Sequence, residues 1–351
     1  MNYSNVQFVS WQLDTSPIET APNVGEYPGL WNFNDGFSKL DVVSQCYDIE
    51  ARVEYLKKVI NIAYDQVKSS NDDVLKIFIA PEFLFRGVAS AYVLDLLNGW
   101  GHAPEEFGIK GMRISENWPG LFGLMDMFLE DEKFKNWLFV IGSAIGASFP
   151  VNNGVIDTNS GEVYNCAYIK LGGYNDENSR HICRKHYMSD IDFLWHTYYI
   201  AHNIDKVSHL LEDVDDQSLA DGSKFQFDQI EVNNRRMKFG LEICLDHSMG
   251  VLRNAQSKVD IQLVPSCGMM LIDDKMVRKE DGLLYAINCD GHRFNPHTSI
   301  KDRDRNELQA NEYGDIDLSH LSIDFHSAEL PARVLWASGL GSLKISRTLP
   351  L

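Results

Sequence analysis

The sequence predicts an α/β fold that forms one large domain over residues 1–351. Strand-like apolar runs alternate with segments of helical periodicity, which is typical of a sheet covered by helices. This alternation continues along the chain with no low-complexity linker and no repeat period. The composition is that of an ordinary globular protein, with 44% hydrophobic and 11% aromatic residues, which excludes intrinsic disorder and coiled coil.

The first strand, helix and strand are the clearest elements. Residues 6–13 (VQFVSWQL) are rich in β-forming residues and predict a strand. Residues 48–68 carry apolar side chains at helical spacing, so they predict a helix with one buried face. The run 74–80 (VLKIFIA) is short and continuously apolar, which is typical of a buried strand.

The later elements follow the same alternation. Helices are predicted over 121–135 and 251–257, and strands over 138–141, 163–170, 237–244 and 259–264. The strand 163–170 is expected to pair with another strand across a turn at 157–161. Weakly periodic segments are expected to be insertions of loops or short helices at 14–45, 88–120 and 188–230, and residues 296–351 are expected to be a C-terminal extension.

Charge and hydropathy exclude several classes of partner. The chain has 32 Lys and Arg against 50 Asp and Glu, a net charge of −18, with no basic stripe, so we expect no binding to nucleic acid or to an anionic membrane surface. No signal peptide is visible at the start, and the apolar runs are too short to span a membrane. Six scattered cysteines predict free thiols in a reducing cytoplasm.

Three reactive residues follow strand-like runs, where α/β sheets place their functional sites. Glu82 lies among phenylalanines, and poor solvation there raises a carboxyl pKa toward the range of a general base. Lys185, in HICRKHY, can hold a developing oxyanion. Cys244, in GLEICLDH, can be a nucleophile if a neighbouring base takes its proton. Taken singly, each has a plainer interpretation: a turn glutamate, a surface lysine and a small buried cysteine.

Two other groupings of reactive residues carry less weight. His181, Cys183 and His186 are close in sequence, but no second ligand pair with regular spacing appears, so we expect no metal. Asp246 and His247 follow the cysteine directly and suggest a Cys-His-Asp triad. Adjacent residues on one strand, however, do not both face the sulfur easily.

Together the three residues resemble a known catalytic triad. Glu82 follows a proline after an apolar strand, Lys185 lies in an Arg-Lys element, and Cys244 lies in a Gly-x-x-x-Cys-x-Asp context. Further matching positions are Gln12, Gly142, Ser143, Asn165, Pro265 and Ser266. In these motifs residues 6–295 resemble the nitrilase (carbon–nitrogen hydrolase) superfamily, whose members use Glu, Lys and Cys in that chain order.

The resemblance implies a four-layer αββα sandwich and a reaction that needs no cofactor. It implies that Glu82 is the general base and Cys244 the nucleophile, while Lys185 and the backbone N–H of Leu245 hold the oxyanion. Leu245 replaces the aromatic residue usual in the family, whereas Asp246 matches its amidase branches rather than its true nitrilases. We therefore expect hydrolysis of a small linear amide.

The remaining site residues are less well defined by the sequence. Many members of the family carry a second glutamate between the lysine and the cysteine, and here Asp190 and Asp192 are the candidates. Candidates for the lining of a substrate pocket are Phe83, His186, Asp246, His247 and Trp195.

Several alternatives stay open beside the amidase interpretation. The chain could be a nitrilase fold that has lost activity and serves as a binding or assembly module, or it could hydrolyse a nitrile. An isochorismatase-like hydrolase would have a shorter domain and an N-terminal Asp, and a papain-like protease would need a downstream histidine, for which His292 and His297 have no informative spacing. The resemblance also implies a homodimer or larger homo-oligomer, with residues 251–255 as a natural contact.

Overall fold

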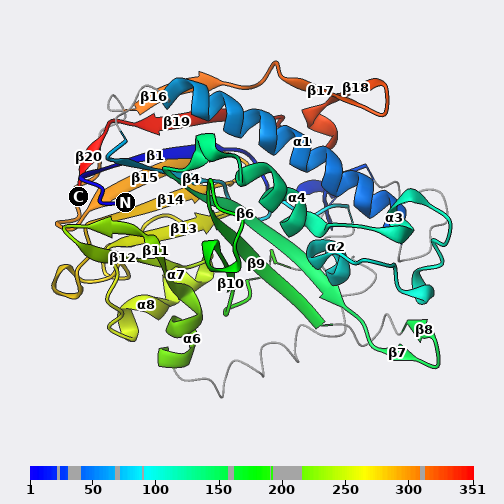
Figure 1. Ribbon diagram of the computed structural model, residues 1–351, viewed down its shortest axis with the longest axis horizontal. Coiled ribbons are helices and arrows are strands. Elements are labelled where there is room, and N and C mark those ends of the chain that lie inside the picture. The colour runs from blue at the N-terminus through cyan, green and yellow to red at the C-terminus, as the bar shows by residue number, and fades with distance from the viewer. Residues whose placement is uncertain are drawn as a thin grey trace.

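The described part of the chain folds into a mixed α/β structure with two large sheets and three two-stranded sheets (Figure 1). The computed structural model describes residues 1–21, 24–30, 41–67, 72–88, 91–156, 162–189, 191–192, 216–308 and 313–351. In this part of the chain no helix is both long and apolar enough to cross a membrane.

The larger sheet has nine strands with a parallel centre. Its strands in spatial order are β10 (Arg180–Arg184), β9 (Glu162–Leu171), β6 (Trp137–Ser148), β4 (Val74–Ile79), β1 (Asn5–Gln12), β19 (Ser342–Ser346) and β16 (Tyr313–Asp317), with β20 (Leu349–Pro350) beside β1 and β5 (Tyr92–Val93) beside β6. β1, β4 and β6 run parallel, and β9, β10, β16 and β19 run antiparallel to their neighbours. The carboxyl ends of the three central strands therefore lie at one edge of the sheet.

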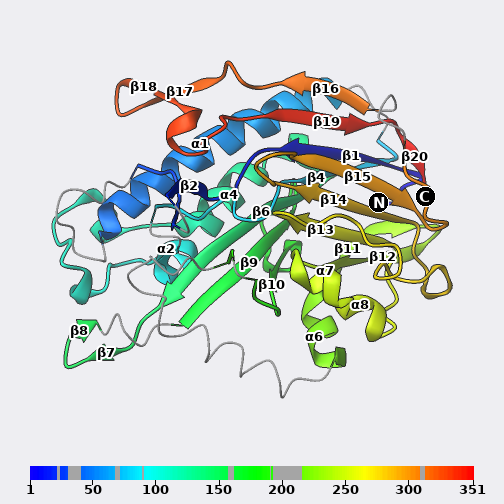
Figure 2. The same cartoon turned by 180° about the vertical axis from the view of Figure 1, so that it is seen from behind.

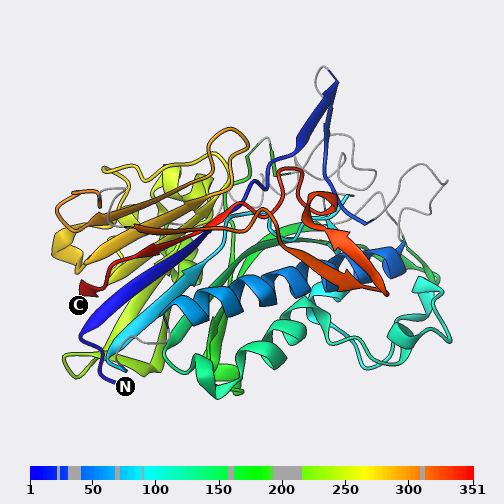
Figure 3. The same ribbon diagram turned by 90° about the horizontal axis from the view of Figure 1, so that it is seen from above.

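The smaller sheet has five strands and is also parallel at its centre. In spatial order they are β11 (Lys224–Val232), β12 (Arg235–Leu241), β13 (Ile261–Ser266), β14 (Tyr285–Asp290) and β15 (His297–Asp302). β12, β13 and β14 are parallel, and the two outer strands are antiparallel. The two-stranded sheets are β2 (Ile18–Ala21) with β3 (Val24–Glu26), β7 (Val151–Asn152) with β8 (Val155–Ile156), and β17 (Ser322–Phe325) with β18 (Ala328–Pro331). Figure 3 shows the β2–β3 hairpin projecting from the body of the molecule.

One apolar layer joins the two large sheets. Val6, Phe8 and Ile77 from the larger sheet belong to the same buried cluster as Phe239 and Leu263 from the smaller sheet. β4 is buried along its entire length, which explains its continuous apolar run. The sheets are thus held together by side chains that alternate out of both inner faces.

Helices lie on the outer faces of both sheets (Figure 2). α1 (Val42–Val67), α2 (Leu94–Asn98) and α4 (Gly120–Leu129) share a buried cluster with the larger sheet, in which Trp11 of β1 packs edge-on against Trp336. α6 (Asp216–Ser223) and α8 (Val251–Asn254) share another cluster with the smaller sheet, and α7 (Leu245–Met249) directly precedes α8. The short α3 (Arg113–Glu116) follows α2.

Most predicted elements are confirmed, with shifted ends. The strands predicted over 6–13, 74–80, 163–170, 237–244 and 259–264 are β1, β4, β9, β12 and β13. The helix predicted over 48–68 begins earlier, at Val42, while the helices predicted over 121–135 and 251–257 end earlier, at Leu129 and Asn254. β6 is much longer than the strand predicted over 138–141. It continues through Gly142 and Gly146, and glycine has a low propensity for strands, so the sequence did not indicate this continuation.

Two segments without strong periodicity supply strands to the sheets. Residues 224–230, at the end of the predicted insertion 188–230, belong to β11, where Phe225 and Phe227 join the cluster between the sheets. The predicted extension 296–351 supplies β15 to the smaller sheet and β16, β19 and β20 to the larger one. The pairing of β19 with β1 joins opposite ends of the chain, and no local sequence signal reports it.

The C-terminal strands should therefore be needed for stability. Leu343 is fully buried in the cluster beneath α1, so Leu343→Ala should lower the free energy of unfolding by about 2–5 kcal/mol. Lys344→Ala on the same strand removes only a surface ion pair with Asp315 and should cost less than about 1 kcal/mol. Urea denaturation followed by circular dichroism measures both. Equal, small losses would show that β19 does not pack into the sheet.

Candidate active site

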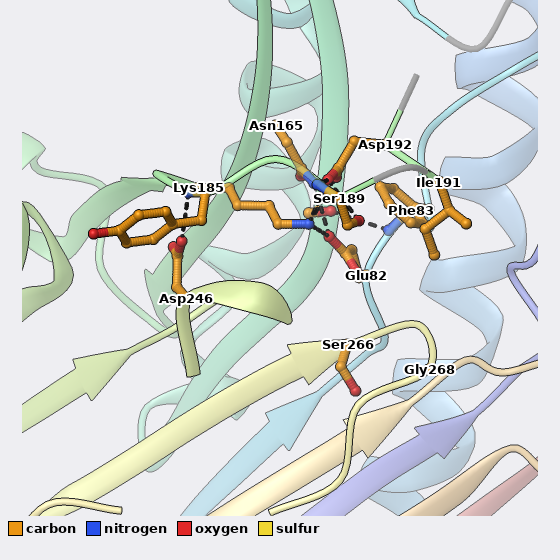
Figure 4. A network of polar contacts seen from close by, with 12 residues as sticks. Glu82, Phe83, Asn165, Lys185, Ser189, Ile191, Asp192, Asp246, Ser266 and Gly268 are labelled. Atoms are coloured by element: carbon orange, nitrogen blue, oxygen red, sulfur yellow. Dashed lines mark hydrogen bonds and ion pairs between the residues drawn. The ribbon is translucent and has the colours of Figure 1, made fainter. Parts of the chain in front are cut away.

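The three candidate catalytic residues lie in loops that follow strands. Glu82 comes shortly after β4, Lys185 directly after β10, and Cys244 shortly after β12. All three are buried, with exposures of 0%, 1% and 4%. The structure places the Lys185 Nζ 2.9 Å from the Glu82 Oε1 (Figure 4). Two residues 103 positions apart in sequence thus form a buried ion pair.

Glu82 is held in an environment that raises its pKa. Its Oε1 accepts hydrogen bonds from Lys185 and, at 2.9 Å, from the Asn165 side-chain amide. The pKa of Glu82 is raised to about 7. Burial is the largest cause of the rise, the Lys185 charge opposes it, and the Asp192 charge adds to it. A carboxyl with a pKa near neutrality can both accept and donate a proton at physiological pH.

Asp192 is the second carboxylate of the site. Its two oxygens each lie 2.7 Å from the Lys185 Nζ, and it also accepts hydrogen bonds from Asn165 and from Ser189. Burial alone lowers the pKa of Lys185, but Glu82 and Asp192 more than reverse this effect, so the pKa is raised and the ammonium stays charged. Of the two aspartates proposed from the sequence, Asp192 occupies this position, and Asp190 lies outside the described residues.

Cys244 occupies a strained turn between β12 and α7. Its φ is 48° and its ψ is −105°, a conformation that non-glycine residues rarely adopt and that is typical of functional turns. Its N–H donates to the Pro265 carbonyl at 3.0 Å, which ties the turn to β13. α7 begins at the next residue, Leu245, and the first N–H groups of a helix have no acceptor inside the helix.

The Cys244 thiol approaches the Glu82 carboxyl. The Oε2 of Glu82 is buried and has no hydrogen-bond partner among the described residues, and the nearby Cys244 thiol lowers the pKa of Glu82. Burial, followed by the Glu82 charge, raises the pKa of Cys244 well above its ordinary value, although Lys185 and the backbone of Cys267 lower it. The thiol is therefore protonated at rest, so it needs a base before it can attack.

The turn that carries Glu82 depends on two positions of β6. The N–H of Phe83, a residue with a φ of 63°, donates to the Ser143 Oγ at 3.0 Å. Gly142 has a φ of 74°, and a Cβ there would lie 2.3 Å from the Pro81 carbonyl oxygen. Gly142 and Ser143 were among the matching positions in the sequence, and here they position the glutamate.

Asp246 joins the loops of Lys185 and Cys244. It is fully buried and accepts backbone N–H groups from His186 at 3.1 Å and Tyr187 at 2.8 Å. Burial raises the pKa of Asp246 to about 8, and these hydrogen bonds oppose the rise. Asp246, which the sequence analysis names as a candidate for the pocket lining, therefore ties the two loops together.

A second buried network holds the start of α7. The Glu242 Oε2 lies 2.9 Å from the His247 Nδ1 and 2.6 Å from the Gln262 Nε2, and the Glu242 Oε1 accepts the N–H of Leu252. The His247 Nε2 accepts the N–H of Ile272 at 3.0 Å, so Nδ1 carries the hydrogen. Both nitrogens of His247 are occupied, which is incompatible with the Cys-His-Asp triad considered from the sequence. The acidic Glu242 within the apolar run 237–244 is the sequence feature that could have indicated this network.

The remaining candidates for the pocket lining are Phe83, His186 and Trp195. Phe83 is buried beside the site, with its ring centroid 5.8 Å from the Lys185 Nζ. His186 is partly buried, and burial lowers its pKa. Trp195 lies outside the described residues. Within the described ranges, no group of three or more His, Cys, Asp or Glu side chains is arranged to hold a metal ion.

Comparison with known proteins gives little similarity. No protein-family model and no curated protein matches this chain. Among solved structures it is similar to glutamine-dependent NAD+ synthetase from Acinetobacter baumannii in complex with ADP, with 14% sequence identity and a TM-score of 0.42. The match covers 87% of this chain and 43% of the synthetase, so this chain spans less than half of that protein. A TM-score of this size carries no argument about function.

The buried ion pairs of Lys185 should contribute strongly to stability. Asp192→Asn keeps the side-chain shape but removes one of the two carboxylates that hold the buried ammonium. Because Lys185 keeps Glu82 as a partner, we expect a loss near the lower end for a broken buried pair, about 3 kcal/mol in the free energy of unfolding.

The matched control is Asp273→Asn, which breaks the more exposed Lys301–Asp273 pair and should change stability little. Chemical denaturation at neutral pH measures both variants. If Asp192→Asn is as stable as the control, then Asp192 does not hold the Lys185 charge.

Proposed function

We propose that this chain is a nitrilase-like carbon–nitrogen hydrolase that cleaves a linear amide through a thioester on Cys244. The observation that carries the proposal is the buried grouping of one thiol, one carboxyl with a pKa of about 7 and one permanent ammonium. The two facing sheets with helices on their outer sides support the αββα sandwich that belongs to this proposal.

The first half of the proposed reaction forms the thioester. Glu82 takes the proton of the Cys244 thiol, and the thiolate attacks the amide carbonyl carbon. The Lys185 ammonium and the N–H of Leu245 stabilise the oxyanion of the tetrahedral intermediate. Glu82 then returns its proton to the leaving nitrogen, the C–N bond breaks, and ammonia or an amine departs.

The second half hydrolyses the thioester. Glu82, now a carboxylate, takes a proton from water, and the resulting hydroxide attacks the thioester carbonyl. The second tetrahedral intermediate uses the same two donors. The C–S bond then breaks, the thiolate is protonated by Glu82, and the acid product leaves. Asp192 stays paired with Lys185 and keeps the ammonium fixed in position.

Cys244→Ala should abolish turnover while the protein remains folded, because a thiol of this size contributes little to packing. Turnover is measured on a panel of amides with matched nitriles of the same acyl group, and folding by circular dichroism. Cys166→Ala, at a partly exposed cysteine outside the site, is the control and should keep full activity. Near wild-type hydrolysis by Cys244→Ala would remove the cysteine from the mechanism, and consumption of the nitrile with the amide untouched would overturn the choice of amide.

The activity should rise with pH through the pKa of Glu82. Below about pH 7 the raised pKa keeps Glu82 protonated, so it cannot accept the thiol proton, and kcat/KM should fall about tenfold per pH unit. Glu82→Gln should keep the shape of the site but lose this base. The pH–rate profile of the wild type and the residual rate of the variant test the assignment. An unchanged profile in Glu82→Gln would show that another group is the base.

A further inference from the structure

Arg86 carries a buried positive charge that the proposed reaction does not use. It lies four residues after Glu82, and only 2% of its surface is exposed. The Phe85 N–H donates to the Ser143 carbonyl, and the Phe85 carbonyl accepts the N–H of Ile145. The backbone next to Arg86 is therefore bonded to β6, close in the chain to the proposed base.

The guanidinium of Arg86 is only partly satisfied. Its Nη2 donates to the backbone carbonyls of Ile191 and Asp192. Nε and Nη1 are buried and have no hydrogen-bond partner among the described residues. A guanidinium has five N–H bonds, so three of them are left without an acceptor. Unsatisfied buried donors are rare in native proteins and call for an explanation.

The Arg86 guanidinium is stacked on two aromatic rings beside a narrow cavity. The Arg86 guanidinium carbon lies 3.7 Å from the centroid of the Phe83 ring and 3.9 Å from that of the Tyr27 ring, so the charge is sandwiched between two aromatic faces. The same narrow cavity is lined by Thr15 and Ser16. Stacked guanidinium groups with free N–H bonds are well suited to bind carboxylates.

The other charged groups of this cavity, Asp14 and Arg52, are already hydrogen-bonded. Asp14 accepts hydrogen bonds from the Ser16 N–H and the Ser338 hydroxyl. Arg52 donates to the Asp48 carboxylate and to two backbone carbonyls, so its three nitrogens are all used. Among the described residues no carboxylate forms an ion pair with Arg86.

Arg86 is linked to Lys185 of the proposed reaction centre through Asp192. Asp192 accepts from Arg86 through its backbone carbonyl and from Lys185 through its carboxylate. The Phe83 ring centroid lies 3.7 Å from the Arg86 guanidinium carbon and 5.8 Å from the Lys185 Nζ, so Phe83 neighbours both cations. Through Asp192 and Phe83, Arg86 therefore adjoins the residues of the proposed reaction centre.

We propose that Arg86 is a specificity-determining residue that binds a carboxylate of the substrate, so that the substrate class is a monoamide of a dicarboxylic acid. This inference rests on the proposed function. A chain with a net charge of −18 repels anions at long range, so an anionic substrate requires a local cation of this kind.

The test compares monoamides of dicarboxylic acids, from malonamate to adipamate, with uncharged amides of equal length. The wild type should prefer the best charged amide by about tenfold or more in kcat/KM, because a hydrogen bond to a charged group is lost with the neutral amide. Arg86→Met should abolish this preference mainly by raising KM for the charged amide. Hydrolysis of the neutral amide should fall less than hydrolysis of the charged amide, because both lose the contact of Arg86 with Asp192 but only the charged amide also loses its ionic partner.

Arg113→Met is the control, because it removes a remote, exposed positive charge and should keep the preference. No preference in the wild type, or an equal loss for both amides in Arg86→Met, would overturn the proposal and leave Arg86 as a positioning residue. If Arg86→Met does not fold, the ratio of the wild-type kcat/KM values for the charged and the neutral amide tests the proposed substrate class.

A binding measurement separates this inference from the proposed function. Calorimetric titration of the wild type and Arg86→Met with the dicarboxylates from malonate to adipate needs no turnover. At least one should bind the wild type and bind Arg86→Met about tenfold or more weakly. If no amide reacts but a dicarboxylate binds the wild type more tightly than Arg86→Met, the result contradicts the proposed hydrolysis and leaves the role of Arg86 intact. Absence of binding to the wild type, or equal binding to both proteins, would contradict the role of Arg86.

Discussion

One buried ammonium group, shared between Glu82 and Asp192, is the interaction on which the rest of the site depends. A charge removed from water must be paired and hydrogen-bonded, or it destabilises the fold. Lys185 satisfies this condition only if the loops after β4 and β10 meet at one point with Asn165 of β9 beside them. The same burial raises the pKa of Glu82 to about 7, so the cluster that holds the loops together also creates the proposed base.

The two sheets supply the geometry that this cluster needs. The parallel central strands of each sheet end at one edge, and the Glu82 N–H donates to the Ser266 carbonyl at 3.3 Å, which links the edge of the larger sheet to that of the smaller. Positive φ angles at Phe83 and Cys244 turn the chain sharply beside the base and the nucleophile. Such conformations persist only where surrounding contacts enforce them, here Gly142 with Ser143 on one side and the Glu242 network on the other.

Much of this arrangement could be predicted from the sequence, and the part that could not has physical reasons. The strands before Glu82 and Cys244 are local patterns of apolar residues, so periodicity revealed them. The place of β19 beside β1 depends on a pairing between the ends of the chain, which no local pattern encodes. The roles of Asp246 and His247 also depend on distant partners. Arg86 gave no signal, because an arginine in a loop looks like a surface residue until its burial is known.

The most direct test of the account is the detection of the acyl-enzyme. Wild-type protein is quenched during turnover of the best amide from the panel, digested, and examined by mass spectrometry. The account predicts a mass increase equal to the acyl group on the peptide that contains Cys244, which disappears as free acid accumulates. Consumption of the amide with no acyl group on Cys244, or with the acyl group on another residue, would contradict the account.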